Sequence, residues 1–145
     1  AVNGLIVMPN YDFQDHPSID ILIVAGGQGT RSLIHDKEHL EWLHRVHSQT
    51  EVTLSICSAA RLFAILGCLD HKPYCTHHQV YDHLRELAPN GKPQPNQRFI
   101  RTDESLYTSG GISAGIDLSF YILAERHGKV VPDRTAQYME YRYAQ

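Results

Sequence analysis

The chain has 145 residues, 42% of them hydrophobic and 20% charged, with a net charge of −3. This length suits one domain with a sizeable core, and the lack of a basic excess argues against nucleic acid or an anionic membrane as a partner. No apolar run is long enough for a membrane span and no signal-peptide pattern is present, so we expect a cytoplasmic protein. The three cysteines have no metal-type spacing and predict neither a disulfide framework nor a zinc site.

The N-terminal part of the chain contains two predicted strands. Residues 4–8 form a short strand candidate that Pro9 stops, and residues 20–25 form a continuous apolar run typical of a central parallel strand covered on both faces. The glycine pair 26–27 could bring backbone N–H groups close to a ligand, although a tight turn without a ligand is at least as common. The order of these glycines fits neither a dinucleotide fingerprint nor a P-loop, so no cofactor is predicted.

The middle of the chain is predicted to form a helix, a strand and a second helix. Residues 35–49 predict an amphipathic helix. Its histidine pairs could in principle serve a metal, but no carboxylate or cysteine matches them elsewhere, and a solvated face explains them better. The β-branched run 52–56 predicts a buried strand, and the apolar residues 62–66 predict a packed helix.

Cys57 stands at the joint between this strand and this helix. A thiol at such a turn lies near unpaired N–H groups and the positive end of the helix dipole, which favour the thiolate. The alternative is a buried cysteine that behaves as a small hydrophobic residue. The neighbouring motifs favour the nucleophile.

The rest of the chain adds shorter elements. They are, in chain order, a strand at 73–76, a helix at 80–88, a turn-rich loop at 89–95, a hairpin-like pair at 98–101 and 105–108, a glycine-rich joint at 109–117, a helix at 118–127 and a final helix from Pro132 to Tyr141. Asp117 is predicted to be a charge at a helix N-terminus, matched to the dipole. Strands alternating with helices predict a parallel sheet with helices on both faces.

Ligands of such sheets gather outside the carboxyl ends of the strands. Four features of this chain follow predicted strands at ends of that kind, and we expect them to converge on one edge of the sheet. They are Gly26-Gly27, Cys57, His77 and Gly110-Gly111.

The motifs at 20–27, 55–60, 76–77 and 109–117, taken as a set, resemble the ThiJ/PfpI superfamily of the class I glutamine amidotransferase-like fold. The sequence is most similar to the isocyanide hydratase-like branch, and nearly as similar to the sensor domains of AraC-type regulators. The resemblance covers essentially the whole chain. It implies an α/β, flavodoxin-like three-layer sandwich with a mostly parallel central sheet and a cysteine nucleophile elbow, as a single domain over 1–145 that forms a homodimer.

The resemblance also implies roles for individual residues. Cys57 is the nucleophile, and the N–H groups of Gly27 and Ser58 are oxyanion donors, a role that suits backbone donors aimed at a developing charge. Ser58 stands where amidase and protease members carry a histidine, so their Cys-His dyad is not expected. The substrate pocket is lined by the remaining residues at the strand ends, which are Gly26, His77, Gly110 and Gly111. His77 is expected to line the wall or cap a strand end more than to act as a base, and neither metal nor cofactor is implied.

Family members begin with a further strand and helix, and that helix carries an acid bonded to the reactive cysteine. We expect the natural protein to have such a unit ahead of Ala1, because the apolar runs 20–25 and 52–56 would otherwise leave a hydrophobic face and an unpaired edge. Loss of the acid in this homologue is the alternative.

The expected function is hydration or hydrolysis of a small electrophilic substrate by Cys57, with an isocyanide as the preferred substrate. One alternative is a non-enzymatic ligand-sensing domain of the AraC-regulator type. Another is a redox or stress sensor that oxidises Cys57 reversibly. Either way, the expected partner is a small molecule.

Overall fold

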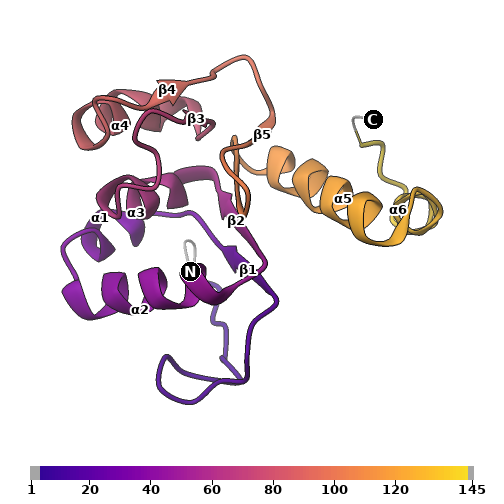
Figure 1. Cartoon of the computed structure of the whole chain (residues 1–145). Coiled ribbons are helices and arrows are strands. Elements are labelled where there is room, and N and C mark those ends of the chain that lie inside the picture. Colours follow the sequence, from indigo (N-terminus) through magenta and orange to yellow (C-terminus); the bar gives the residue numbers. More distant parts are fainter. Residues whose placement is uncertain (1–3, 144–145) are drawn as a thin grey trace.

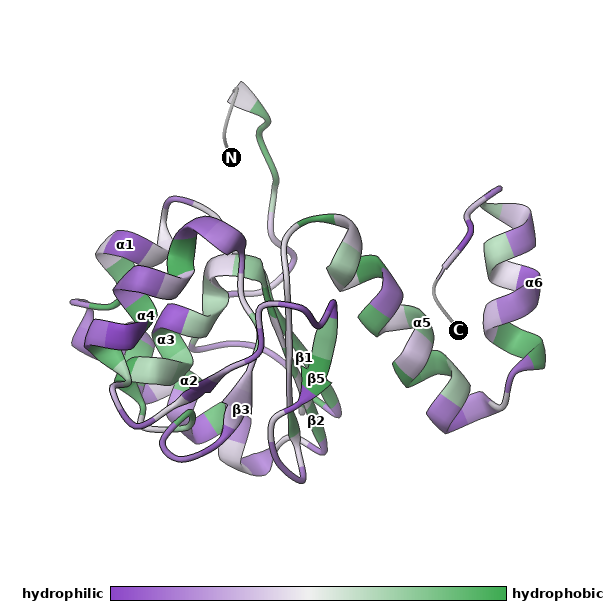
Figure 2. Cartoon of the chain, turned by 90° about the horizontal axis from the view of Figure 1, so that it is seen from above, coloured by the Kyte–Doolittle hydropathy of each residue, from purple (hydrophilic) through white to green (hydrophobic). Residues whose placement is uncertain are grey.

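The computed structural model describes residues 4–143 and has three layers (Figures 1 and 2). The central sheet has four strands, in spatial order β1 (Ile21–Val24), β2 (Val52–Ile56), β6 (Leu106–Ser109) and β5 (Phe99–Arg101). The first three run parallel, and β5 is antiparallel to β6. The mostly parallel sheet between layers of helices confirms the predicted flavodoxin-like α/β sandwich.

Helices cover both sides of the sheet, as Figure 2 shows. One side carries α1 (Thr30–Leu33), α2 (Lys37–Gln49), α3 (Ala60–Ile65) and α4 (Tyr81–Leu87), and the other carries α5 (Ser113–His127) with α6 (Val130–Tyr138) outside it. Two short 3₁₀ turns, η2 (Cys57–Ala59) and η3 (His78–Val80), lead into α3 and α4. The predicted amphipathic helix corresponds to α2, which Asp36 caps by accepting the His39 N–H at 3.2 Å.

The core has one cluster on each side of the sheet. The larger cluster lies under α2, α3 and α4 and includes Leu43, Phe63 and Leu84. The smaller one joins Leu54 and Tyr107 of the sheet to α5. Strand β2 is buried on both faces, with Leu54 in the smaller cluster and the fully buried Thr53 and Ser55 on the other face, which fixes its carboxyl end and the residues that follow it.

Both predictions for the N-terminal strands need correction. Residues 4–8 belong to neither sheet, and the segment leads away from the body of the molecule (Figure 2). Strand β1 is an edge strand and not a central one, since within the described residues no strand pairs with its outer edge. Side chains alternate along a strand, so Leu22 packs in the core while Ile21 and Ile23 are 38% and 59% exposed.

The predicted loop at 89–95 contains a strand that the sequence did not indicate. Strand β4 (Lys92–Pro93) pairs in parallel with β3 (Pro73–Tyr74), forming a separate two-stranded sheet. The Tyr74 ring is fully buried, and a Cβ on Gly91 would lie 2.7 Å from it. Tertiary packing, which no local pattern records, therefore decides this pairing.

Helix α5 begins at Ser113, five residues before the predicted start. Gly115 lies inside this helix. A Cβ at this position would lie 2.8 Å from Ile56 Cγ2, so the absence of a side chain lets the helix pack closely against β2. The prediction for Asp117 is also wrong: the residue lies in the second turn of α5, its side chain is 3% exposed, and it pairs with Arg98. The hairpin-like pair and the helix containing Pro132 are confirmed.

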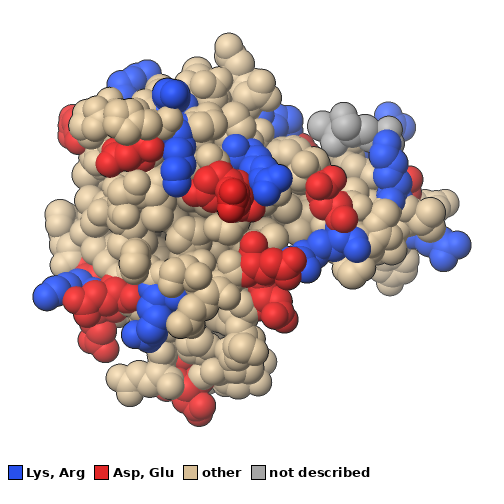
Figure 3. Space-filling view, in the orientation of Figure 1, with Lys and Arg blue, Asp and Glu red and all other residues tan. Residues whose placement is uncertain are grey.

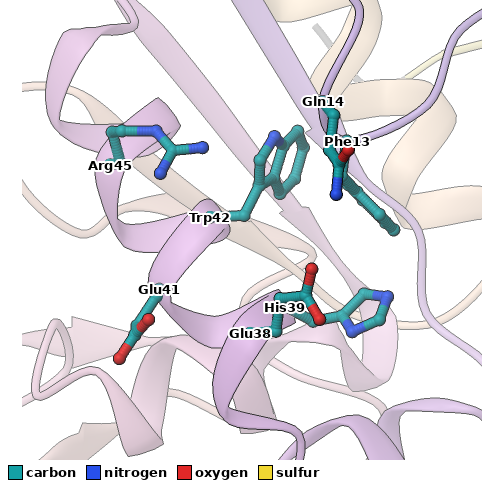
Figure 4. A pocket seen from close by; sticks show the side chains of 7 residues that line it. All are labelled: Phe13, Gln14, Glu38, His39, Glu41, Trp42 and Arg45. Carbon is teal, nitrogen blue, oxygen red and sulfur yellow. The ribbon is translucent and has the colours of Figure 1, made fainter.

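Acidic and basic side chains are interspersed on the face shown in Figure 3. Segment 9–19 lies over α2, where Phe13 contacts the Trp42 ring edge-on at 4.6 Å and Trp42 Nε1 donates to His16 Nε2 at 3.1 Å. A hollow of about 140 Å³ opens there (Figure 4). None of the helices in residues 4–143 combines the length and apolarity needed to cross a membrane.

Candidate functional site

Cys57 occupies a sharp turn at the carboxyl end of β2. Its φ is +59°, a conformation that side chains rarely adopt and that costs about 1–3 kcal/mol unless the surroundings impose it. The turn is held in part by the Cys57 carbonyl, which accepts a hydrogen bond from Thr76 Oγ1 at 2.8 Å. The predicted elbow is therefore present, and a backbone outlier at a cysteine favours a functional role.

The partly exposed Cys57 lines a cavity of about 290 Å³. The residues around this cavity come from the segments that follow β1, β2, β3 and β6, including the first turns of α1 and α3. They are Gly27, Gln28, Arg31, Cys57, Ser58, Arg61, His77, Gln79, Val80 and Ile112. No aspartate or glutamate of the described chain is among them. The structure thus brings four of the predicted site residues together, whereas Gly26, Gly110 and Gly111 do not line this cavity.

The two N–H groups expected to be oxyanion donors differ in whether they already have a hydrogen-bond acceptor. The Gly27 N–H donates to Ser58 Oγ at 2.8 Å, so it becomes free for a substrate only if the hydroxyl turns away. The Ser58 N–H lies in the first turn of η2, where a helix offers no acceptor of its own. Ser58 N–H is therefore the donor that this geometry leaves available beside Cys57.

Gly26 does not line the cavity, but it allows the turn after β1 to pack against the Cys57 turn. A Cβ at this position would lie 2.8 Å from the Ile56 carbonyl oxygen and 2.9 Å from the Ser58 nitrogen. The turn after β1 can approach the Cys57 turn this closely only because residue 26 has no side chain.

His77 lies on the wall of the cavity, and its Nδ1 accepts the Gln79 N–H at 3.3 Å. Partial burial lowers the pKa of the His77 imidazole, and the neighbouring His78 and Arg61 lower it further. Gly111 backs the ring, since a Cβ there would be 2.5 Å from His77 Cδ2. Gly110 and Gly111 line an adjacent groove of about 420 Å³ that also contains Arg85.

Six lining residues were not predicted from the sequence, and they are Gln28, Arg31, Arg61, Gln79, Val80 and Ile112. Arg61 is 3% exposed, and its signal was present: it is the only charged residue in the otherwise apolar stretch 59–66. Ile112 follows the second glycine pair and, with φ +45°, is 84% exposed at the mouth of the cavity. A positive φ at an exposed residue such as Ile112 produces no recognisable pattern of residue types in a single sequence.

The other two thiols lie in apolar surroundings. Burial raises the pKa of the Cys68 thiol, and it raises the pKa of Cys75 to about 11. All three cysteines are free of disulfides. No cluster of metal-ligating side chains occurs within the part of the chain that the structure describes. Cys57 is therefore the thiol that lines the cavity, whereas Cys75 is buried and the partly exposed Cys68 lies elsewhere.

The chain is similar to several known proteins. Residues 2–125 match the DJ-1/PfpI family. The isonitrile hydratase of Pseudomonas putida is 32% identical over 125 residues, which cover 86% of this chain and 53% of that protein. The HTH-type transcriptional regulator GbdR of Pseudomonas aeruginosa is 25% identical over 129 residues, covering 89% of this chain and 34% of the regulator.

The chain thus spans about half the length of the hydratase and a third of the regulator. Among solved structures, a ThiJ/PfpI family protein from Pseudomonas syringae superimposes with a TM-score of 0.84 at 24% identity, over 98% of this chain and 58% of that one. At this identity the likeness is one of fold.

Proposed function

The chain belongs to the DJ-1/PfpI family, and from that premise we propose that it uses Cys57 as a nucleophile to hydrate or hydrolyse a small electrophile, with an isocyanide (isonitrile) as the preferred substrate. The observation that carries the proposal is the strained Cys57 turn, with φ +59°, facing a cavity of about 290 Å³. Similarity to an isonitrile hydratase supports this choice of substrate.

In the proposed reaction the Cys57 thiolate adds to the terminal carbon of R–NC, and that carbon takes up a proton to give the thioimidate R–N=CH–S. Water then adds to the same carbon and the nitrogen is protonated. Collapse of this adduct breaks the C–S bond, releasing the formamide R–NH–CHO and regenerating the thiol. The net change is the addition of one water molecule.

Residues around Cys57 suit parts of this scheme. The Ser58 N–H can donate to the oxygen that develops negative charge during collapse, and Gly27 can join it if the Ser58 hydroxyl moves. His77 is the described lining residue whose imidazole can exchange a proton with the substrate or with water. We propose that a carboxylate outside the described residues supplies the proton to carbon, as the resemblance implies.

The test compares the wild type with Cys57→Ser. Formamide production from methyl isocyanoacetate should be lost in Cys57→Ser, while the melting temperature stays within a few degrees because the hydroxyl is nearly isosteric. In the wild type, limiting iodoacetamide should label Cys57 before Cys68 and Cys75, because desolvation raises the pKa of those two thiols. Turnover that survives in Cys57→Ser, or preferential labelling of either other cysteine, would refute the nucleophile.

A ligand-sensing domain is the second candidate. It is favoured by the absence of any carboxylate from the described lining of the cavity, and by the similarity to the regulator GbdR. A sensor would bind its ligand equally well in Cys57→Ser, and neither form would turn over an electrophile. Binding that is unchanged by the substitution, without Cys57-dependent turnover, would establish the sensor instead of the enzyme.

We also propose that the protein is a cytoplasmic homodimer. The family resemblance supports the dimer, and three cysteines without a disulfide are in keeping with a reducing compartment. Light scattering after size-exclusion chromatography gives the mass in solution, and twice the mass of the chain is expected.

A further inference from the structure

The guanidinium of Arg61 is a buried positive charge in the wall of the Cys57 cavity. Arg61 is 3% exposed, although arginine is almost never fully buried unless it is paired with an acid. Within residues 4–143 it forms no ion pair, and the cavity lining contains no aspartate or glutamate. Among the described residues at the cavity only a Cys57 thiolate offsets this charge, and no carboxylate supplies the compensation that burial normally requires.

Neutral partners hold this guanidinium in place. Its Nε donates to His83 Nδ1 and its Nη1 donates to Thr30 Oγ1, both at 3.0 Å. The Thr30 hydroxyl in turn donates to the Gly27 carbonyl at 2.8 Å, which ties Arg61 to the turn beside Cys57. Nη2 has no hydrogen-bond partner in the described part of the chain, so donors remain for a ligand.

A second cation lies at the same cavity. Arg31 is exposed and lines the cavity. Burial lowers the pKa of the Arg61 guanidinium and the charge of Arg31 lowers it further, whereas Cys57 raises it. Two like charges beside one small cavity repel each other, and an anion between them would relieve both the repulsion and the desolvation of Arg61. The planar guanidinium fork matches a carboxylate in particular.

We infer that the cavity at Cys57 takes a small ligand that carries a carboxylate, which Arg61 binds from the wall and Arg31 attracts from the rim. This inference rests on the proposed function and narrows its substrate class to anionic electrophiles such as an isocyano acid. The cavity of about 290 Å³ has room for about ten non-hydrogen atoms, at the about 30 Å³ that a water molecule occupies in the liquid.

Alkylation of Cys57 tests the inference without any turnover. Iodoacetate and iodoacetamide are nearly the same size and react identically: the thiolate forms a C–S bond to the CH₂ group, and iodide leaves. The ratio of their second-order rate constants cancels the thiolate fraction, which both reagents share. N-acetylcysteine in the same buffer gives the reference ratio. We expect the iodoacetate/iodoacetamide ratio at Cys57 to exceed the reference at least tenfold.

Substitutions then locate the source of the preference. Arg61→Met keeps the apolar stem and should return the ratio to within about twofold of the reference, while Arg61→Lys should keep part of the preference. Arg31→Gln, at an exposed position where folding is not at risk, should lower the ratio two- to threefold. Arg134→Gln on α6 is the matched control, since Arg134 is exposed and does not line the cavity. It should leave the ratio unchanged.

Several results would overturn the inference. They are a wild-type ratio equal to the reference, a preference that persists in both Arg61→Met and Arg31→Gln, and a Cys57 that neither reagent modifies. The outcome is separable from that of the proposed function. Cys57-dependent turnover of neutral isocyanides with no iodoacetate preference would retain the hydratase and reject the carboxylate site. A strong preference without turnover of either isocyanoacetate or its methyl ester would do the reverse.

Discussion

At the scale of single residues, the closest backbone approach in the site is that of Gly26 to the Cys57 turn. A Cβ on Gly26 would meet two backbone atoms, the Ile56 oxygen and the Ser58 nitrogen, at 2.8 and 2.9 Å. Backbone atoms cannot rotate away as a side chain can, so relief requires the two turns to separate. Separation would disturb the bond between Gly27 and Ser58 that sits beside the thiol.

We therefore predict that Gly26→Ala costs about 1–3 kcal/mol of stability and slows iodoacetamide labelling of Cys57. Gly29→Ala is the matched control, because Gly29 has φ −56° and no atom lies within 4 Å of its added Cβ. It should be neutral or stabilising by up to about 1 kcal/mol. Urea unfolding and mass spectrometry of the labelled protein measure both effects. Equal behaviour of the two variants would contradict the steric account.

His47 gives the molecule a pH-dependent contact. Its Nδ1 lies 2.9 Å from Thr53 Oγ1 of β2, and its ring meets Phe63 edge-on at 5.4 Å. Burial lowers the pKa of His47 despite the opposing charge of Asp103. The folded state therefore resists protonation more than the unfolded state, whose imidazole has a pKa of about 6.5.

The sign of the pH effect follows from that difference. The stabilising contribution is fully present above about pH 6.5 and is lost as the pH falls toward the lowered pKa of the folded state. Between pH 7.5 and 5.5 the melting temperature of the wild type should fall more steeply than that of His47→Gln. His35→Gln, an exposed residue just before α2, should keep the wild-type slope. Parallel curves for the wild type and His47→Gln would disprove this role.

At the scale of secondary structure, one buried acid joins three segments. Asp117 of α5 pairs with Arg98, next to β5, and accepts a hydrogen bond from the Tyr141 hydroxyl at 3.1 Å. The Asp117 side chain is 3% exposed, whereas that of Arg98 is 48% exposed. Removing the acid leaves Arg98 able to reach water, so the cost should be below the 3–5 kcal/mol typical of a fully buried pair.

We predict that Asp117→Asn destabilises the protein by about 1–3 kcal/mol. The exposed pair of Asp82 and Arg85 on α4 supplies the control, and Asp82→Asn should change stability by less than about 1 kcal/mol. Urea unfolding of the two variants gives the comparison. A cost for Asp82→Asn as large as that for Asp117→Asn would show that burial does not set the energetics of these pairs.

The elements that local patterns could identify are those whose own residues dictate them. The period of apolar residues in α2 and the β-branched run of β2 predicted both correctly, and with β2 came the position of Cys57. The start of α5 and the pairing of β3 with β4 depend on contacts with Ile56 and Tyr74 that lie far away in sequence. Arg61 is a different case: its position in the apolar stretch 59–66 could have indicated its burial, but its partners Thr30 and His83 lie far away in sequence.

At the scale of the whole molecule, the sheet is open at β1. Ile21 and Ile23 are exposed on one face of this edge strand, while Leu22 between them packs in the core. An apolar edge with unpaired N–H and C=O groups is a template for another strand. We propose that a strand–helix unit ahead of Ala1 covers this edge, and that it carries the acid that serves Cys57.

This proposal predicts how the 145-residue chain behaves in solution. The chain should bind a hydrophobic dye and self-associate, and Ile23→Thr should weaken both effects. The substitution should change the free energy of unfolding by no more than about 0.5 kcal/mol, because the Ile23 side chain is 59% exposed and threonine suits a strand. Ile65→Thr on α3, a residue 41% exposed away from the edge, should have no such effect. In a protein that carries the preceding unit, Ile23→Thr should instead destabilise, since Ile23 would then be buried. A stoichiometric dimer that Ile23→Thr abolishes would show that a second copy of the chain covers the edge. A monodisperse chain that binds no dye would reject both a preceding unit and a second copy as the cover of this edge.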